Sequence, residues 1–163
     1  MSGKPQVAAA EPVAPESSID MQTPPRAVAQ GAQKVIVVLV EFRDKRHTRA
    51  TENIRKLVFT DLNDYYRDVS YGLMSITGDI TDKWYVTQTA HGKLDIEQWN
   101  YDDDDMEKFE REAVRASDVD VIFRNYDFVI FVSAGAVWPH ANCDFDVATN
   151  DGGRLRGFVV NGR

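Results

Sequence analysis

The sequence holds few residues of the kinds that disulfides and metal centres need. Its 163 residues include one cysteine, Cys143, and three histidines, His47, His91 and His140. A single cysteine excludes an internal disulfide, so the chain carries no sign of an oxidising compartment and none against one. No His-Glu-x-x-His occurs, the pattern that commonly supplies hydrolytic zinc with two ligands and a general base. We therefore expect no catalytic residue, metal ligand or cofactor-binding residue in this chain.

Long apolar runs and basic clusters are missing as well. No stretch approaches the ~20 apolar residues that span a bilayer. The three alanines at 8–10 are followed by Glu11 and Pro12, which leaves them too short for the core of a signal peptide. The net charge is −7, and Lys and Arg form no stripe that could neutralise nucleic-acid phosphates. We expect neither a membrane nor a nucleic acid as a partner.

The sequence contains no motif that indicates nucleophilic or acid–base catalysis. Neither Ser70 nor Ser133 lies in a Gly-x-Ser-x-Gly turn, which rules out a nucleophile elbow. The acidic pair Asp118 and Asp120 precedes an apolar run, and we interpret it as the turn after a helix.

Two acidic segments raise the question of calcium, which prefers clustered oxygen ligands. The run Asp102–Asp105 is interpreted as the N-terminus of a helix, where carboxylates are favoured by the unsatisfied N–H groups. The segment Asp144–Gly153 places acidic and amide residues at alternate positions before two glycines, but it lacks the closing Glu of a calcium loop.

The patterning predicts a leader followed by one domain. Residues 1–33 are rich in Ala, Pro, Gln and Ser and predict a disordered leader or linker. A domain is expected from Lys34 to Arg163, opening with a buried strand from Val35 to Phe42. Apolar residues spaced by three and four from Thr51 predict an amphipathic helix that ends near Gly72, the expected C-cap.

The remaining elements alternate in type. A strand is expected over Leu73–Ile80 with a possible bulge at Gly78, and Trp84–Thr87 is either its continuation or a hairpin partner. The chain from 88 to 103 is expected to form a loop before a second helix that carries Met106, Phe109, Ala113 and Val114. A buried strand is expected over Tyr126–Gly135, an irregular segment over 136–153 and a last strand over Leu155–Val160. The pattern predicts an α/β (α+β) domain with two main helices on a twisted mixed sheet.

Four blocks stand out for their wording and their order. They are Val35–Asp44, whose strand ends in Glu-Phe-x-Asp, Asp64–Leu73, which contains Tyr-Tyr-x-x-x-Ser-Tyr-Gly, Thr77–Ile80 with Trp84-Tyr85, and Tyr126–Gly135. Blocks of this kind in this order resemble the immune inhibitor A family of secreted zinc metallopeptidases. The resemblance covers roughly residues 34–135. It implies the N-terminal lobe of a zincin-like fold, in which an edge strand pairs with extended substrate.

The resemblance also implies what this chain does not carry. In the family the zinc-binding helix follows these elements, so residues 34–163 are expected to be the N-terminal part of a catalytic domain, truncated before that helix and inactive alone. Zinc, with calcium as a further candidate, belongs to the full-length relatives, which are usually extracellular. The expected partners are the C-terminal half of the domain and a peptide or protein substrate. Without that helix, Phe128–Val132 is expected to be less well covered.

Two other interpretations stay open. The same sheet could hold a peptide or calcium without chemistry, as a non-catalytic binding module. The chain could also be an unrelated acidic α/β domain, which an entirely parallel sheet would favour.

Overall fold

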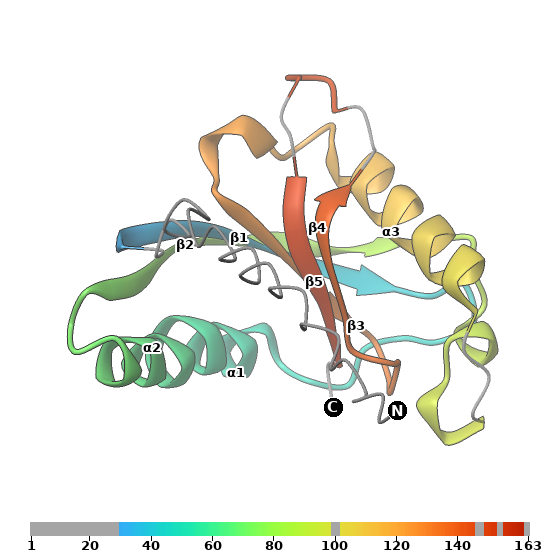
Figure 1. Cartoon of the computed structure of the whole chain (residues 1–163). Helices are drawn as coiled ribbons and strands as arrows, with labels where there is room; N and C mark the ends of the chain where they lie inside the picture. Colours follow the sequence, from blue (N-terminus) through green and yellow to red (C-terminus); the bar gives the residue numbers. More distant parts are fainter. Residues whose placement is uncertain (1–29, 99–101, 146–148, 153–154, 162–163) are drawn as a thin grey trace, which may run out of the picture.

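A five-stranded sheet with helices on both faces forms the described part of the chain (Figure 1). The computed structural model describes residues 30–98, 102–145, 149–152 and 155–161. The strands are β1 Gly31–Glu41, β2 Met74–Val86, β3 Phe128–Ser133, β4 His140–Phe145 and β5 Leu155–Asn161. The helices are α1 Thr51–Lys56, which continues through a π-helical stretch Leu57–Leu62 into α2 Asn63–Val69, and α3 Asp103–Ser117.

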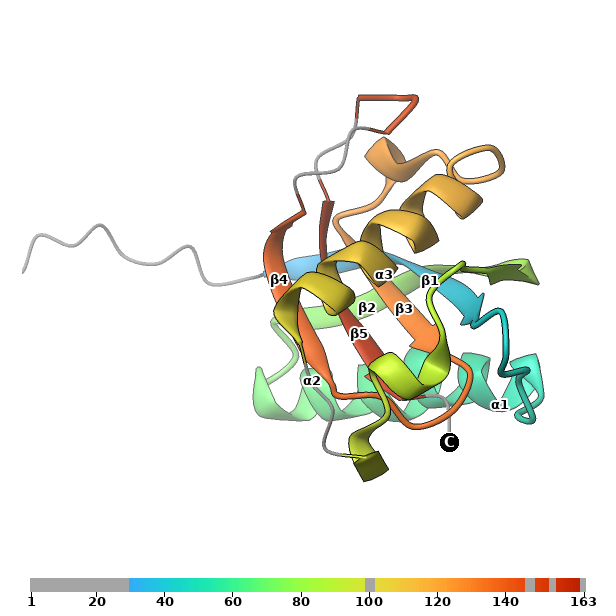
Figure 2. The same ribbon diagram turned by 90° about the vertical axis from the view of Figure 1, so that its right-hand side faces the viewer.

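The sheet is mixed, as the sequence predicted. Its strand order is β2-β1-β3-β5-β4. Neighbouring strands from β2 to β5 run parallel, whereas β4 pairs with β5 antiparallel. In the sheet, β2 lies on one side of β1 and β3 lies on the other side. The chain passes from β1 to β2 and then through α3 to β3, as can be followed in Figure 2. The described residues therefore form an α/β layered fold with a parallel centre and an antiparallel edge.

Alternate residues of β1 build two separate cores. Ile36, Val38 and Val40 pack in one cluster with Phe109 and other apolar residues of α3. Val35, Val37 and Leu39 pack in a second cluster with Ile54 and Val58, from α1 and the π-helical stretch. A strand covered on both faces needs an uninterrupted apolar run, which explains why β1 could be predicted from its sequence.

The expectation that β3 would be poorly covered is wrong. Val129 and Phe131 are fully buried in the α3 cluster, and Ile130 and Val132 are each 3% exposed in the α1 cluster. Helices within the described residues thus cover both faces of β3.

The segment after the first helix is one long strand. Trp84-Tyr85-Val86 continues β2, so the hairpin alternative is excluded. The register with β1 shifts between Ile80 and Trp84, where four residues of β2 advance against two of β1. The bulge therefore lies after Ile80. The sequence had suggested a bulge at Gly78, and that expectation is wrong. Gly78 instead allows close approach, because a Cβ there would lie 1.8 Å from the Val35 carbonyl oxygen.

The first helix ends in two left-handed residues. The Gly72 N–H donates to the Arg67 carbonyl at 2.7 Å and the Tyr71 N–H donates to the Asp68 carbonyl at 3.1 Å, which together form a Schellman motif. Gly72 has the predicted positive φ of 79°, but Tyr71 precedes it with φ 54° and is the first left-handed residue. The helix end therefore imposes strain on an exposed tyrosine.

Two strand boundaries differ from the sequence prediction. β1 begins at Gly31, inside the predicted leader, because residues 31–34 pair with Met74–Thr77. The segment 136–153, expected to be irregular, contains β4, which gains its strand structure from pairing with β5. Both elements depend on distant partners rather than on local pattern.

Candidate functional site

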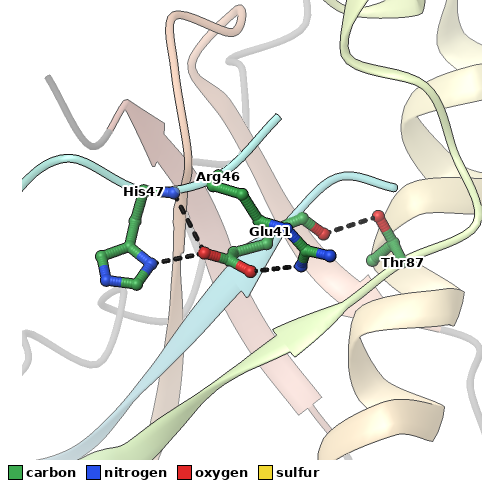
Figure 3. A network of polar contacts seen from close by, with 4 residues as sticks. All are labelled: Glu41, Arg46, His47 and Thr87. Atoms are coloured by element: carbon green, nitrogen blue, oxygen red, sulfur yellow. Dashed lines mark hydrogen bonds and ion pairs between the residues drawn. The ribbon is translucent and has the colours of Figure 1, made fainter. Parts of the chain in front are cut away.

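A buried carboxylate holds the loop that follows β1 (Figure 3). Glu41, the last residue of β1, is 5% exposed. It accepts hydrogen bonds from the Arg46 guanidinium at 2.6 Å, from the His47 backbone N–H at 3.0 Å and from His47 Nδ1. The Glu41 carbonyl also accepts from the Thr87 N–H and hydroxyl. One residue thereby ties β1 to its own loop and to the end of β2.

Two opposing effects set the pKa of Glu41. Burial, the largest, raises it, but the hydrogen bonds from His47 and Arg46 together with the Arg46 charge outweigh burial, and the pKa is lowered below its usual value. Glu41 is therefore ionised at neutral pH. The His47 ring in turn stacks on Trp84 with ring centroids 4.3 Å apart.

The next residues connect this loop to the loop after β2. Phe42 is fully buried and packs against the rings of Phe109 and His91. The Asp44 carboxylate accepts a hydrogen bond from the His91 N–H at 2.8 Å. The Glu-Phe-x-Asp sequence therefore acts as a structural junction in this chain, in which each of its three specified residues fixes a different contact.

A crevice of about 240 Å³ opens beside this junction. Loops after β1, β2 and β3 line it, at the carboxyl ends of the parallel strands. The lining residues are Lys45, Arg46, Thr48, His91, Asp95, Glu97, Gly135 and Ala136. In open α/β sheets, ligands bind in such crevices where neighbouring strands connect in opposite directions, as β1 and β3 do here.

His91 and Asp95 form a largely buried part of the crevice lining. The side chains of His91 and Asp95 are 13% and 12% exposed, with 3.6 Å between His91 Nδ1 and an Asp95 oxygen. Asp95 also accepts from the Glu97 N–H and the Gln98 side chain. His91 Nε2 is buried without a hydrogen-bond partner. This pair places an imidazole beside an oriented carboxylate at the wall of the crevice.

The two histidines whose side chains are described lie apart in separate contacts. His47 and His91 have separate partners on separate loops, and the side chain of His140 lies outside the described residues. Among the residues that are described, no three His, Cys, Asp or Glu side chains are grouped so as to hold a metal. Cys143 likewise falls where side chains are not described.

The acidic segments that suggested calcium have other partners. Asp102 caps α3, accepting hydrogen bonds from the Asp104 and Asp105 N–H groups, which confirms the helix N-terminus. Of the segment Asp144–Gly153, the side chains of residues 149–152 are described. The Asp151 carboxylate accepts from the Arg124 N–H and the Thr149 hydroxyl. Its oxygens are therefore already used within the chain.

The serines and the acidic pair also have structural roles. The Ser70 hydroxyl accepts from the Met74 N–H at 2.9 Å, and Ser133 is fully buried at the end of β3. Asp118 and Asp120 form the predicted turn after α3. Asp120 accepts from Tyr85 and pairs with Lys83 at 2.7 Å.

The sequence did not single out the crevice. Lys45, His91 and Gly135 are separated by more than 40 residues along the chain and share no local motif. The one available sign was the position of small and polar residues directly after the predicted buried strands.

Comparison with protein-family models and with curated proteins finds no match for this chain. None of the helices in the described ranges is long and apolar enough to cross a bilayer.

Proposed function

We propose that this chain forms the N-terminal lobe of a zinc metallopeptidase of the immune inhibitor A type. In this proposal the lobe presents extended substrate to a zinc centre whose ligands and general base lie in a following segment. The observation that carries this proposal is the difference between the two edges of the sheet. Side chains block the β2 edge against a further strand, whereas the opposite edge is formed by the antiparallel strand β4.

The β2 edge is closed by side chains of the preceding helix and turn. The Met74 N–H donates to the Ser70 hydroxyl, and the Ile76 N–H donates to the Asn63 side chain at 2.8 Å. The bulge after Ile80 then interrupts the strand. An edge strand whose N–H groups are occupied by side chains and which contains a bulge does not readily pair with a further strand.

The opposite edge is β4, which pairs with β5 on one side only within the described sheet. A peptide added there would gain main-chain hydrogen bonds along an antiparallel or parallel ladder. This arrangement agrees with the substrate-pairing edge that the resemblance implies for a zincin-like lobe.

The roles of the motif residues support the same proposal. Glu41, Phe42 and Asp44 join the loops after β1 and β2, and Ser70-Tyr71-Gly72 ends the first helix and closes the β2 edge. These residues stabilise the lobe itself, independently of any catalytic residue. This role would account for their presence in a chain without a zinc motif.

The test is to read the genomic DNA beyond the codon for Arg163 in three frames and to express the longer chain. We expect His-Glu-x-x-His within a few dozen codons, and casein hydrolysis by the longer chain that a chelator abolishes. The 163-residue chain, supplied with one equivalent of zinc, serves as the control and should not hydrolyse casein. A longer chain without the motif, or chelator-sensitive hydrolysis by the control itself, would overturn the proposal.

The coverage of both faces of β3 favours a second candidate, a non-catalytic peptide- or calcium-binding module, since such a module needs its own helices to complete the core. It predicts a cooperative thermal transition together with saturable binding of an extended peptide or of calcium. It replaces the first proposal if no zinc motif follows in any frame.

A further inference from the structure

The crevice at the carboxyl ends of β1 and β3 has unused hydrogen-bond donors, and this observation is independent of the proposed peptidase lobe. Lys45 forms no ion pair with any described residue, whereas its neighbour Arg46 is paired with Glu41. The Thr48 hydroxyl and the backbone N–H groups of Gly135 and Ala136 also have no hydrogen-bond partner in the described part of the chain. The residues that carry these donors line one small cavity.

Gly135 keeps that cavity open. A Cβ on Gly135 would lie 2.6 Å from His91 Nε2 and 3.3 Å from Lys45 Cε, and its φ of 92° also disfavours a side chain. The Lys45 stem and the edge of the imidazole thus lie directly over a backbone that only glycine allows. Close approach of backbone amides to a ligand is a common reason for such a glycine.

The charges limit what the crevice can hold. Asp95 and Glu97 line it together with Lys45 and Arg46, but Arg46 is already paired with Glu41. Among the described residues, the ammonium of Lys45 is therefore the one cation of the lining that forms no ion pair. A dianion such as phosphate would bring two negative charges to this one free cation, next to the carboxylates of Asp95 and Glu97. A ligand carboxylate carries a single negative charge, which matches the single positive charge of Lys45.

We propose that this crevice binds the carboxylate of a small acid or of a peptide C-terminus, with Lys45 as its counter-ion and the amides of Gly135 and Ala136 as neutral donors. The volume of about 240 Å³ suits a terminal group rather than a whole drug-sized ligand. No bond is made or broken in this assignment.

The experiment follows the amide resonances of Gly135 and Ala136 in the ¹⁵N-labelled chain during titration. N-acetyl-alanyl-alanine is compared with its C-terminal amide, acetate represents small acids, and inorganic phosphate is the dianionic probe. We expect saturable shifts with the free peptide acid and none with the amide. Tighter binding of acetate than of the peptide acid would identify small acids as the source of the carboxylate, and the reverse would identify a peptide C-terminus.

Three variants test the role of the ammonium. Lys45→Met keeps the stem over Gly135 but removes the charge, and it should weaken binding about tenfold, the loss expected for one charge-assisted hydrogen bond. Lys45→Arg should retain binding, and Lys108→Met, which removes an exposed lysine of α3, should leave it unchanged.

Four results would overturn the proposal: no saturable shift, equal binding of acid and amide, undiminished binding by Lys45→Met, or tighter binding of phosphate than of either carboxylate. The comparison of acid with amide uses the unmodified chain, so a folding defect in a variant does not affect it.

Discussion

Replacing Glu41 by glutamine should cost about 2 kcal/mol of folding free energy at pH 7. The amide keeps the size of the carboxylate but turns an NH₂ group toward at least one of the three donors that Glu41 now accepts from. Hydrogen bonds to charged groups contribute roughly 1.5–3 kcal/mol each. Water offsets much of this loss here, because the Arg46 and His47 side chains are 63% and 42% exposed.

The cost should depend on pH in a defined direction. The folded pKa of Glu41 is lowered, so its ionisation stabilises the native state above the unfolded value of about 4.5, and this contribution is lost as the pH falls through the folded pKa. The difference between wild type and Glu41→Gln should therefore shrink below about pH 4.5, by up to about 1.4 kcal/mol per pH unit.

Urea denaturation at pH 7, 4.5 and 3.5 measures this difference. Glu52→Gln is the matched control, because the Glu52 side chain is 83% exposed and lies 3.6 Å from Arg55, and it should cost under about 0.5 kcal/mol at each pH. The reasoning fails if Glu41→Gln costs no more than the control, or if its cost is the same at pH 7 and 3.5.

Four further substitutions test the backbone and the closed edge. Gly78→Ala should cost roughly 3 kcal/mol in urea denaturation, because its Cβ would meet the Val35 carbonyl, whereas Gly72→Ala, with open space around it, should cost about 1 kcal/mol. Equal costs would contradict the close approach. Tyr71→Gly should stabilise the chain by about 0.5 kcal/mol by the same assay, since the 95% exposed tyrosine has φ 54°, and a loss of stability would refute the strain. Asn63→Ala should cost about 1 kcal/mol and increase concentration-dependent light scattering, because a β2 amide loses its partner; unchanged scattering would mean that the edge is closed by other means.

The elements that the sequence predicted well are those whose burial is complete or whose ends have local hydrogen bonds. The apolar run of β1 and the three-and-four spacing of the first helix are direct consequences of burial. Asp102 marks the start of α3 because its carboxylate caps the N–H groups two and three residues later. Such patterns require no knowledge of distant residues.

The errors occurred where a distant residue decides the structure. β4 is polar and short, and only its pairing with β5 makes it a strand. Gly78 allows no bulge but a close approach to Val35, more than 40 residues earlier. The crevice could not be predicted for the same reason. Its lysine, histidine and glycine are distant in the sequence, and only the strand order shows that they lie close together. With that order, the rule for parallel sheets places the crevice directly.

The parallel pairing of β1 has a consequence for synthesis of the chain. β1 leaves the ribosome before its neighbours, yet it pairs with Phe128–Ser133 more than 90 residues later. At about 5–20 residues per second, β1 spends roughly 5–20 s without that neighbour. One edge of the apolar run of β1 therefore lacks its native partner while the intervening elements and β3 itself are synthesised.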